Sequence, residues 1–87
     1  MVLTAKHYVG LVHGLETFSQ IVSYDKGADQ FYIPYLPINI KDDAFFPHRG
    51  LMIDTARHFL NKEAIKKVID GMSFTKLNVL HWHVSDA

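Results

Sequence analysis

The sequence contains no cysteine, and its charge is balanced, with nine lysines and arginines against nine aspartates and glutamates. Without cysteine, these residues can form neither a disulfide framework nor a thiolate zinc site. A chain with no net charge also lacks the basic surface that binds nucleic acid. We therefore expect no nucleic-acid partner.

Long apolar runs are missing too. No run approaches the roughly 20 residues that a bilayer-spanning helix needs. The residues after Met1 show neither the charged region nor the apolar region of a secretory signal peptide. What is present is a chain with 48% hydrophobic and 13% aromatic residues. That composition predicts a folded core rather than a disordered segment.

The first part of the chain predicts a helix. Apolar residues recur at three- and four-residue steps from Thr4 to Val22, which indicates an amphipathic helix with Thr4 as the N-cap. Gly10 and Gly14 lie four residues apart within it. Their spacing predicts that a neighbouring strand packs closely against this side of the helix.

Short strands and a domain boundary are predicted next. Residues 25–27 have the composition of a turn, and residues 31–33 and 38–41 are expected as short strands. The segment 41–47 then reads as the boundary between two domains. We place the first domain at residues 1–45 and the second at 46–87.

The second part of the chain predicts a strand, a helix and a strand. Residues 51–56 and 78–84 are the expected strands, and 78–84 is apolar enough to be covered on both faces. Asn61 fits the N-cap of the helix between them. One helical face carries apolar residues at the spacing of a buried surface, namely Ile65, Val68, Ile69 and Met72.

A strand, a helix and a parallel strand within about 35 residues make a βαβ unit. A complete (β/α)8 barrel needs about 250 residues. We therefore expect an incomplete α/β fold. It would comprise the first βαβ unit of a (β/α)8 TIM barrel, preceded by the last helix and strands of an α+β domain.

Three side chains near the end of the chain could take part in chemistry. Asp86 follows the carboxyl end of the second strand, where parallel α/β folds place their active sites, although it could instead cap a following helix or turn. His81 and His83 face the same side of the strand and could bind a metal. Since no third ligand is evident, we expect both to be ordinary, partly buried histidines rather than metal ligands. Trp82, between them, is expected to pack in the core.

Two arginines flank the first strand. The guanidinium of Arg49 can form paired hydrogen bonds to vicinal hydroxyls or to a carboxylate, and the alternative is an ion pair with Asp54 or a downstream carboxylate. Its position before the strand belongs to the stability face of a barrel. Asp54 and Arg57 are expected to form a structural ion pair.

Segments along the chain resemble the family 20 glycoside hydrolases, the β-N-acetylhexosaminidases. Residues 14–20 (Gly-Leu-Glu-Thr-Phe-Ser-Gln) resemble the last helix of the α/β domain that precedes the family's barrel. Residues 46–50 (Phe-Pro-His-Arg-Gly) and 54–59 (Asp-Thr-Ala-Arg-His-Phe) resemble the first barrel strand and its approach. Residues 76–83 (Lys-Leu-Asn-Val-Leu-His-Trp-His), followed by Asp86, resemble the second strand and its loop.

The resemblance implies a hydrolase that releases terminal non-reducing N-acetyl-D-hexosamine residues with retention of configuration. In this family the sugar's own 2-acetamido group acts as the nucleophile, an exception to the usual pair of carboxylates. A glutamate serves as general acid and base, and the aspartate before it orients the acetamido group. That Asp-Glu pair is expected downstream of these residues, so the 87 residues alone are expected to be inactive.

The resemblance also implies two site residues. Arg49 is matched to the arginine that holds the hydroxyls of the terminal sugar, and Asp86 to the aspartate that joins a histidine and the general acid in a relay. We expect no metal or other cofactor. The expected partners are glycans ending in N-acetylglucosamine or N-acetylgalactosamine. The resemblance is also compatible with a homodimer of the full-length protein, and it implies a lysosomal, secreted or cell-surface location.

Other functions stay open. One alternative is a metal-dependent TIM-barrel hydrolase that uses His81 and His83 as ligands. Another is a non-catalytic sugar-binding relative that keeps Arg49 without the acid. The third is a truncated gene product with no independent role.

Overall fold

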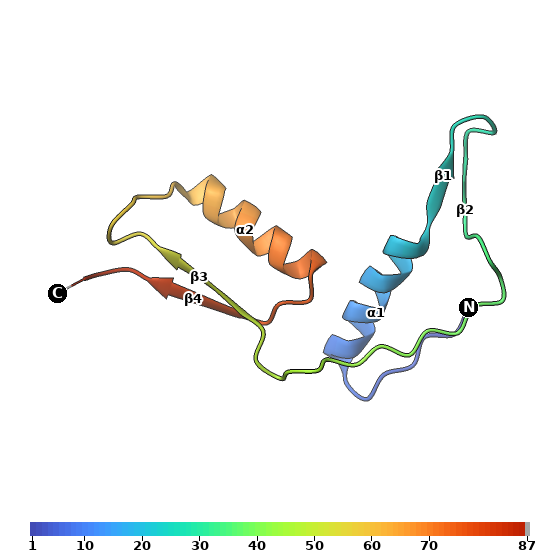
Figure 1. Ribbon diagram of the computed structural model, residues 1–87, viewed down its shortest axis with the longest axis horizontal. Coiled ribbons are helices and arrows are strands. Elements are labelled where there is room, and N and C mark those ends of the chain that lie inside the picture. The colour runs from blue at the N-terminus through green and yellow to red at the C-terminus, as the bar shows by residue number, and fades with distance from the viewer. Residues whose placement is uncertain (87) are drawn as a thin grey trace. The chain divides into compact units, whose positions relative to one another are not determined.

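The computed structural model describes residues 1–86 and divides the chain into two compact units, Met1–Asp42 and a second that starts at Asp43 (Figure 1). Together the elements make a mixed α/β fold. None of the helices within the described residues is both long and apolar enough to span a membrane.

The first unit is a helix followed by a β-hairpin. Helix α1 covers Tyr8–Ile21, and strands β1 (Ser23–Asp25) and β2 (Gln30–Tyr32) pair antiparallel (Figure 1). The predicted turn is confirmed, because the Asp25 carboxylate accepts a hydrogen bond from the Gly27 backbone N–H at 2.9 Å. Such an Asp side chain closes a turn by replacing a backbone acceptor.

Two predictions for this unit are wrong. Helix α1 begins at Tyr8, and its N-cap is His7, whose side chain makes no capping hydrogen bond, so Thr4 does not cap the helix. Residues 38–41 form no strand. Pro37 supplies no backbone donor, and no strand of the described chain pairs with this segment, so a ladder cannot form there.

The two glycines of α1 are closely approached, but by another partner than the sequence predicts. A Cβ built on Gly10 would lie 2.9 Å from the Cβ of Ala5, and a Cβ on Gly14 would overlap the side chain of Leu3. The residues before the helix, rather than a strand, therefore pack on its glycine side. A glycine spacing predicts a close approach without identifying which segment makes it.

The second unit is the predicted βαβ unit. Strand β3 (Gly50–Asp54) and strand β4 (Val79–His83) pair in parallel, and helix α2 (Lys62–Phe74) connects them (Figure 1). The register runs from Gly50 opposite Val79 to Asp54 opposite His83. Matching strand ends therefore lie side by side, as a parallel crossover requires.

The core of this unit lies between the helix and the sheet. Ile53 of β3 and Ile65 and Met72 of α2 are each 8% exposed. Helix α2 lies over one face of the two strands (Figure 1). One helix cannot cover both faces of a sheet, and Trp82 of β4 remains 45% exposed. The prediction of a strand buried on both faces is therefore wrong for this chain.

Helix α2 begins as its sequence predicts. The Asn61 side-chain oxygen accepts a hydrogen bond from the Ala64 backbone N–H at 2.8 Å. Glu63 lies in the first turn, where a negative charge is favourable against the helix dipole. This cap fixes where the chain leaves the loop after β3 and enters the helix.

Replacing the cap should weaken the second unit. In the intact protein, Asn61→Ala should lower the free energy of unfolding by about 1 kcal/mol, because the Ala64 N–H loses its acceptor. Asn61→Asp keeps an acceptor and should cost much less. Urea unfolding followed by circular dichroism measures both. Equal losses in the two variants would show that the side-chain cap contributes nothing.

Candidate functional site

The carboxyl ends of β3 and β4 are tied together beyond the last strand pair. The Thr55 backbone N–H donates to the His83 carbonyl at 3.0 Å. The Thr55 hydroxyl accepts a hydrogen bond from the indole N–H of Trp82 at 2.9 Å. Parallel α/β folds place ligands at this edge of the sheet. The two bonds therefore fix the relative positions of the segments that leave it.

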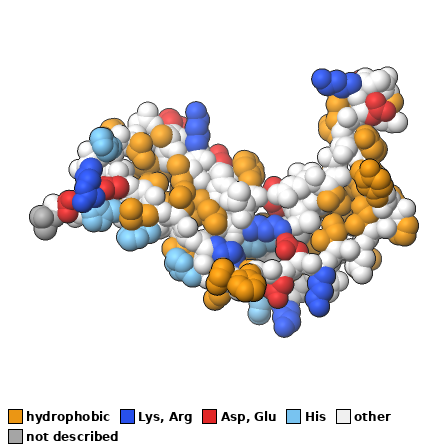
Figure 2. Space-filling view, in the orientation of Figure 1, with side chains coloured by type: hydrophobic (Ala, Val, Ile, Leu, Met, Phe, Trp, Pro, Cys, Tyr) orange, Lys and Arg blue, Asp and Glu red, His pale blue; other side chains and the backbone are white. Residues whose placement is uncertain are grey.

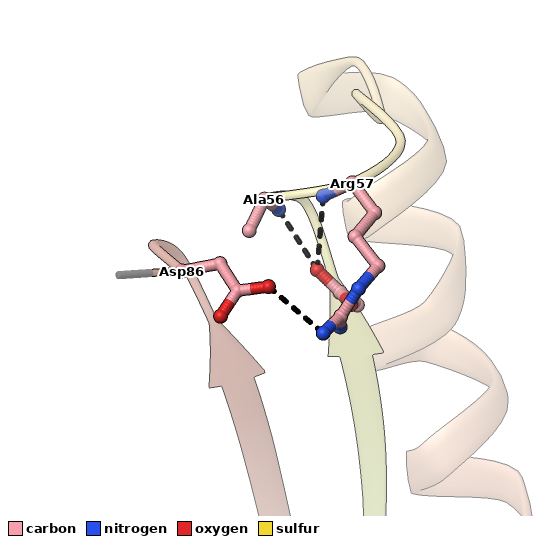
Figure 3. Close-up of polar contacts among 4 residues, drawn as sticks. Ala56, Arg57 and Asp86 are labelled. Atoms are coloured by element: carbon pink, nitrogen blue, oxygen red, sulfur yellow. Dashed lines mark hydrogen bonds and ion pairs between the residues drawn. The ribbon is translucent and has the colours of Figure 1, made fainter.

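The turn after β3 is organised by the carboxylate of Asp54. Its Oδ1 accepts hydrogen bonds from the backbone N–H groups of Ala56 at 2.9 Å and Arg57 at 3.2 Å (Figure 3). An aspartate that accepts two downstream N–H groups holds a tight turn in one conformation. The turn brings the Arg57 side chain back toward the strand end.

The guanidinium of Arg57 lies between two carboxylates. Nη1 contacts Asp54 Oδ2 at 2.5 Å, and Nη2 contacts Asp86 Oδ2 at 2.8 Å (Figure 3). The three side chains are 63%, 21% and 50% exposed for Arg57, Asp54 and Asp86, respectively. We call this group the carboxyl-end cluster. Arg57 and Asp86 are thus largely exposed to solvent, whereas Asp54 is mostly covered.

This cluster is part of a larger polar surface. Figure 2 shows basic and acidic side chains gathered near the C-terminal end of the chain, with histidine side chains beside them. Together these side chains offer both hydrogen-bond donors and acceptors to a polar ligand.

The cluster perturbs the ionisation of Asp54. The hydrogen bond from the Arg57 side chain is the main cause that lowers the pKa of the Asp54 carboxyl, and the two backbone N–H donors act in the same direction. Partial burial opposes them without reversing the shift. Asp54 therefore stays a carboxylate in weakly acidic solution and keeps its hold on Arg57.

Arg49 makes a different set of contacts at the amino end of the same strands. Its Nε donates to the Lys76 carbonyl at 2.9 Å, and its Nη1 donates to the carbonyls of Phe46 at 2.7 Å and Pro47 at 3.3 Å. Asn78 completes this amino-end clamp by accepting from the Arg49 backbone N–H at 2.9 Å and donating to the Pro47 carbonyl at 2.8 Å.

The structure therefore places at opposite ends of the sheet the two residues that the family resemblance assigns to one site. Asp86 lies beyond the carboxyl end of β4, whereas Arg49 precedes β3 at the opposite end of the sheet. Asp86 is paired with Arg57 instead. The predicted ion pair between Asp54 and Arg57 is confirmed, and the alternative pairing of Arg49 with Asp54 is not found.

Arg57 is the residue whose importance the sequence argument underrates. It follows the end of β3 by three residues, on the edge where barrel enzymes carry their sites. That position was a usable signal. However, Arg57 lies only three residues after Asp54, a spacing that predicts a local surface ion pair with no further role.

The remaining candidates do not assemble into a metal centre. Within residues 1–86, no group of three or more histidine, aspartate or glutamate side chains is placed to hold a metal ion. His81 is exposed and His83 is half-buried. Trp82 does not pack in the core as predicted, because its half-exposed ring ends in the hydrogen bond to Thr55.

The second unit matches a known family. Residues 46–87 match the family described as "Glycosyl hydrolase family 20, catalytic domain". The matched segment contains β3, α2 and β4, together with the carboxyl-end cluster and the amino-end clamp. The metal-dependent alternative is not favoured by this match.

Curated relatives align with nearly the whole chain. Beta-hexosaminidase 3 of Arabidopsis thaliana is 49% identical over 97% of this chain and 16% of its own length. Beta-hexosaminidase subunit beta of Mus musculus is 49% identical over 98% of this chain and 15% of its own. The Chitooligosaccharidolytic beta-N-acetylglucosaminidase of Ostrinia furnacalis is 40% identical over 98% of this chain and 14% of its own length. The chain thus spans 14 to 16% of the length of these relatives.

The amino-end clamp should contribute mainly to stability. In the intact protein, Arg49→Lys should lower the free energy of unfolding by about 1–2 kcal/mol, because one ammonium cannot replace a planar donor that bonds three carbonyls. Arg57→Lys is the matched control, since exposed ion pairs contribute little. Thermal unfolding measures both variants. An equal or larger loss in Arg57→Lys would contradict the stabilising role of the clamp.

Removing the guanidinium should restore the ordinary ionisation of Asp54. Arg57→Gln should raise the pKa of the Asp54 carboxyl toward its usual value of about 3.9. Because the folded pKa is depressed, the pair stabilises the fold above that usual value and stops doing so as pH falls through the depressed one. Carboxyl-carbon NMR titration of the two proteins measures the change. An unchanged Asp54 pKa would contradict the pairing.

Proposed function

We propose that the protein containing this chain is a β-N-acetylhexosaminidase, because residues 46–87 match the catalytic domain of glycosyl hydrolase family 20. Its proposed reaction is the hydrolysis of terminal non-reducing N-acetyl-D-hexosamine residues. The support is the identity of 40 to 49% with three relatives named for this activity, over nearly all of the chain. Because the chain covers a small share of those relatives, the proposal concerns the intact protein.

We further propose that β3, α2 and β4 form the first βαβ unit of a (β/α)8 barrel. The parallel register of the two strands and the helix over one sheet face fit such a unit. Residues 1–45 are proposed to be the end of the α/β domain that precedes the barrel. The remaining strands would cover the sheet edges and the half-exposed side chains of this unit.

The observation that carries the site is the position of Arg57 at the carboxyl ends of both strands. Its guanidinium offers several donors to solvent while Asp54 and Asp86 hold it in place. A planar guanidinium of this kind can donate paired hydrogen bonds to neighbouring hydroxyls of a sugar. We therefore assign the sugar-holding role, which the family resemblance implies for Arg49, to Arg57.

Asp86 is proposed to act through the general acid rather than on the sugar. Its carboxylate lies past the end of β4, beside the guanidinium of Arg57. A carboxylate at this edge can accept a hydrogen bond from a protonated partner and help set the pKa of that partner. The general acid is proposed to come from the rest of the intact protein.

The proposed reaction keeps the configuration of the sugar. In family 20 the substrate's own acetamido oxygen attacks the anomeric carbon, so the enzyme supplies an acid and a means of positioning. Glycans ending in N-acetylglucosamine or N-acetylgalactosamine are the proposed substrates. A lysosomal, secreted or cell-surface location and a homodimer of the intact protein remain part of the proposal.

Kinetics of the intact protein tests this function. The unmodified protein should hydrolyse p-nitrophenyl N-acetyl-β-D-glucosaminide, with activity that survives a chelator. Arg57→Lys should raise KM by roughly tenfold, because a single ammonium cannot make paired bonds to two hydroxyls. Arg49→Lys should change KM by less than about twofold.

Two outcomes would contradict the proposal at different points. No turnover by the well-folded unmodified protein would refute the hexosaminidase activity. A KM that rises with Arg49→Lys and stays unchanged with Arg57→Lys would return the sugar-holding role to Arg49 while leaving the activity intact.

A further inference from the structure

Both carboxylate oxygens of Asp54 contact the segment that carries Arg57. Oδ1 accepts from the backbone N–H groups of Ala56 and Arg57, and Oδ2 contacts the Arg57 guanidinium (Figure 3). One side chain therefore sets both the backbone turn and the direction of the long arginine side chain. A surface ion pair without a further role would need only the second of these contacts.

The two carboxylates that hold Arg57 differ in how firmly they are fixed. Asp54 is the last residue of β3 and lies in register with His83 of β4. Its side chain is 21% exposed. Asp86 lies beyond the last residue of β4, and its side chain is 50% exposed. The sheet therefore anchors one side of the guanidinium through Asp54.

From this arrangement we propose that Asp54 is a positioning residue that orients the Arg57 guanidinium toward the terminal sugar. The inference rests on the proposed function. An arginine side chain has several rotatable bonds, and a 63% exposed one would be mobile without a fixed partner. Holding it beforehand lowers the ordering entropy that sugar binding would otherwise cost.

The informative substitution is Asp54→Asn. The amide oxygen can still accept from the N–H groups of Ala56 and Arg57, so the turn is kept. The amide N–H₂ group then replaces Oδ2 and presents donors to the guanidinium, which itself has only donors. The substitution thus removes the hold on Arg57 with little change to the backbone. Asp70→Asn, on the exposed surface of α2, makes the same chemical change away from the cluster and serves as the control.

The test uses the intact protein with p-nitrophenyl N-acetyl-β-D-glucosaminide. Asp54→Asn should raise KM about five- to tenfold and change kcat by less than about threefold, with a thermal midpoint close to that of Asp70→Asn. A purely structural role would lower the midpoint without this preference for KM. Asp70→Asn should keep the KM of the unmodified protein.

A double-mutant cycle shows whether Asp54 acts through Arg57. In an Arg57→Lys background, Asp54→Asn should raise KM by less than about twofold, because the guanidinium that it positions is already gone. Multiplicative effects of the two substitutions would overturn the inference. So would an unchanged KM in Asp54→Asn alone. Because both results require an active unmodified protein, they are distinct from failure of the proposed function, in which that protein shows no turnover.

Discussion

The parallel pairing of β3 with β4 is the constraint on which the rest of the second unit depends. A parallel pair needs a crossover, and α2 supplies it, with its Ile65 and Met72 buried together with Ile53 of β3. Because the strands run the same way, the residues that follow them emerge at one edge. Arg57 and Asp86, 29 positions apart in sequence, can meet there only for this reason. The site is thus a consequence of strand direction.

The two ends of this sheet carry arginines with opposite kinds of partner. Arg49 donates to backbone carbonyls, which ties the chain entering β3 to the chain entering β4. Arg57 contacts carboxylates of side chains at an exposed edge. Carbonyl partners fix the course of the backbone, whereas a guanidinium that contacts an exposed carboxylate, here Asp86, can exchange that contact for a ligand. The same residue type is therefore structural at one end and available for binding at the other.

The sequence predicts the local features well because their signals are local. Helix α2, its Asn61 cap and the two parallel strands follow from periodicity and capping chemistry. The errors concern partners that are distant in sequence or have no pattern of their own. The segment that approaches Gly14 and the exposure of Trp82 both depend on how elements pack. No single-sequence periodicity encodes those contacts.

The carboxyl-end cluster fits the proposed binding role better than a stabilising one. Ion pairs between exposed side chains contribute little to folding, because water screens the charges and the ordered side chains lose entropy. Arg57 and Asp86 are largely exposed, yet their charged groups are brought together with Asp54 from two different strand ends. An arrangement that adds little stability but fixes the direction of a strong hydrogen-bond donor is the preorganisation that a polar ligand requires. In this cluster, the strand ends and the turn at Asp54 together set the direction of the Arg57 guanidinium.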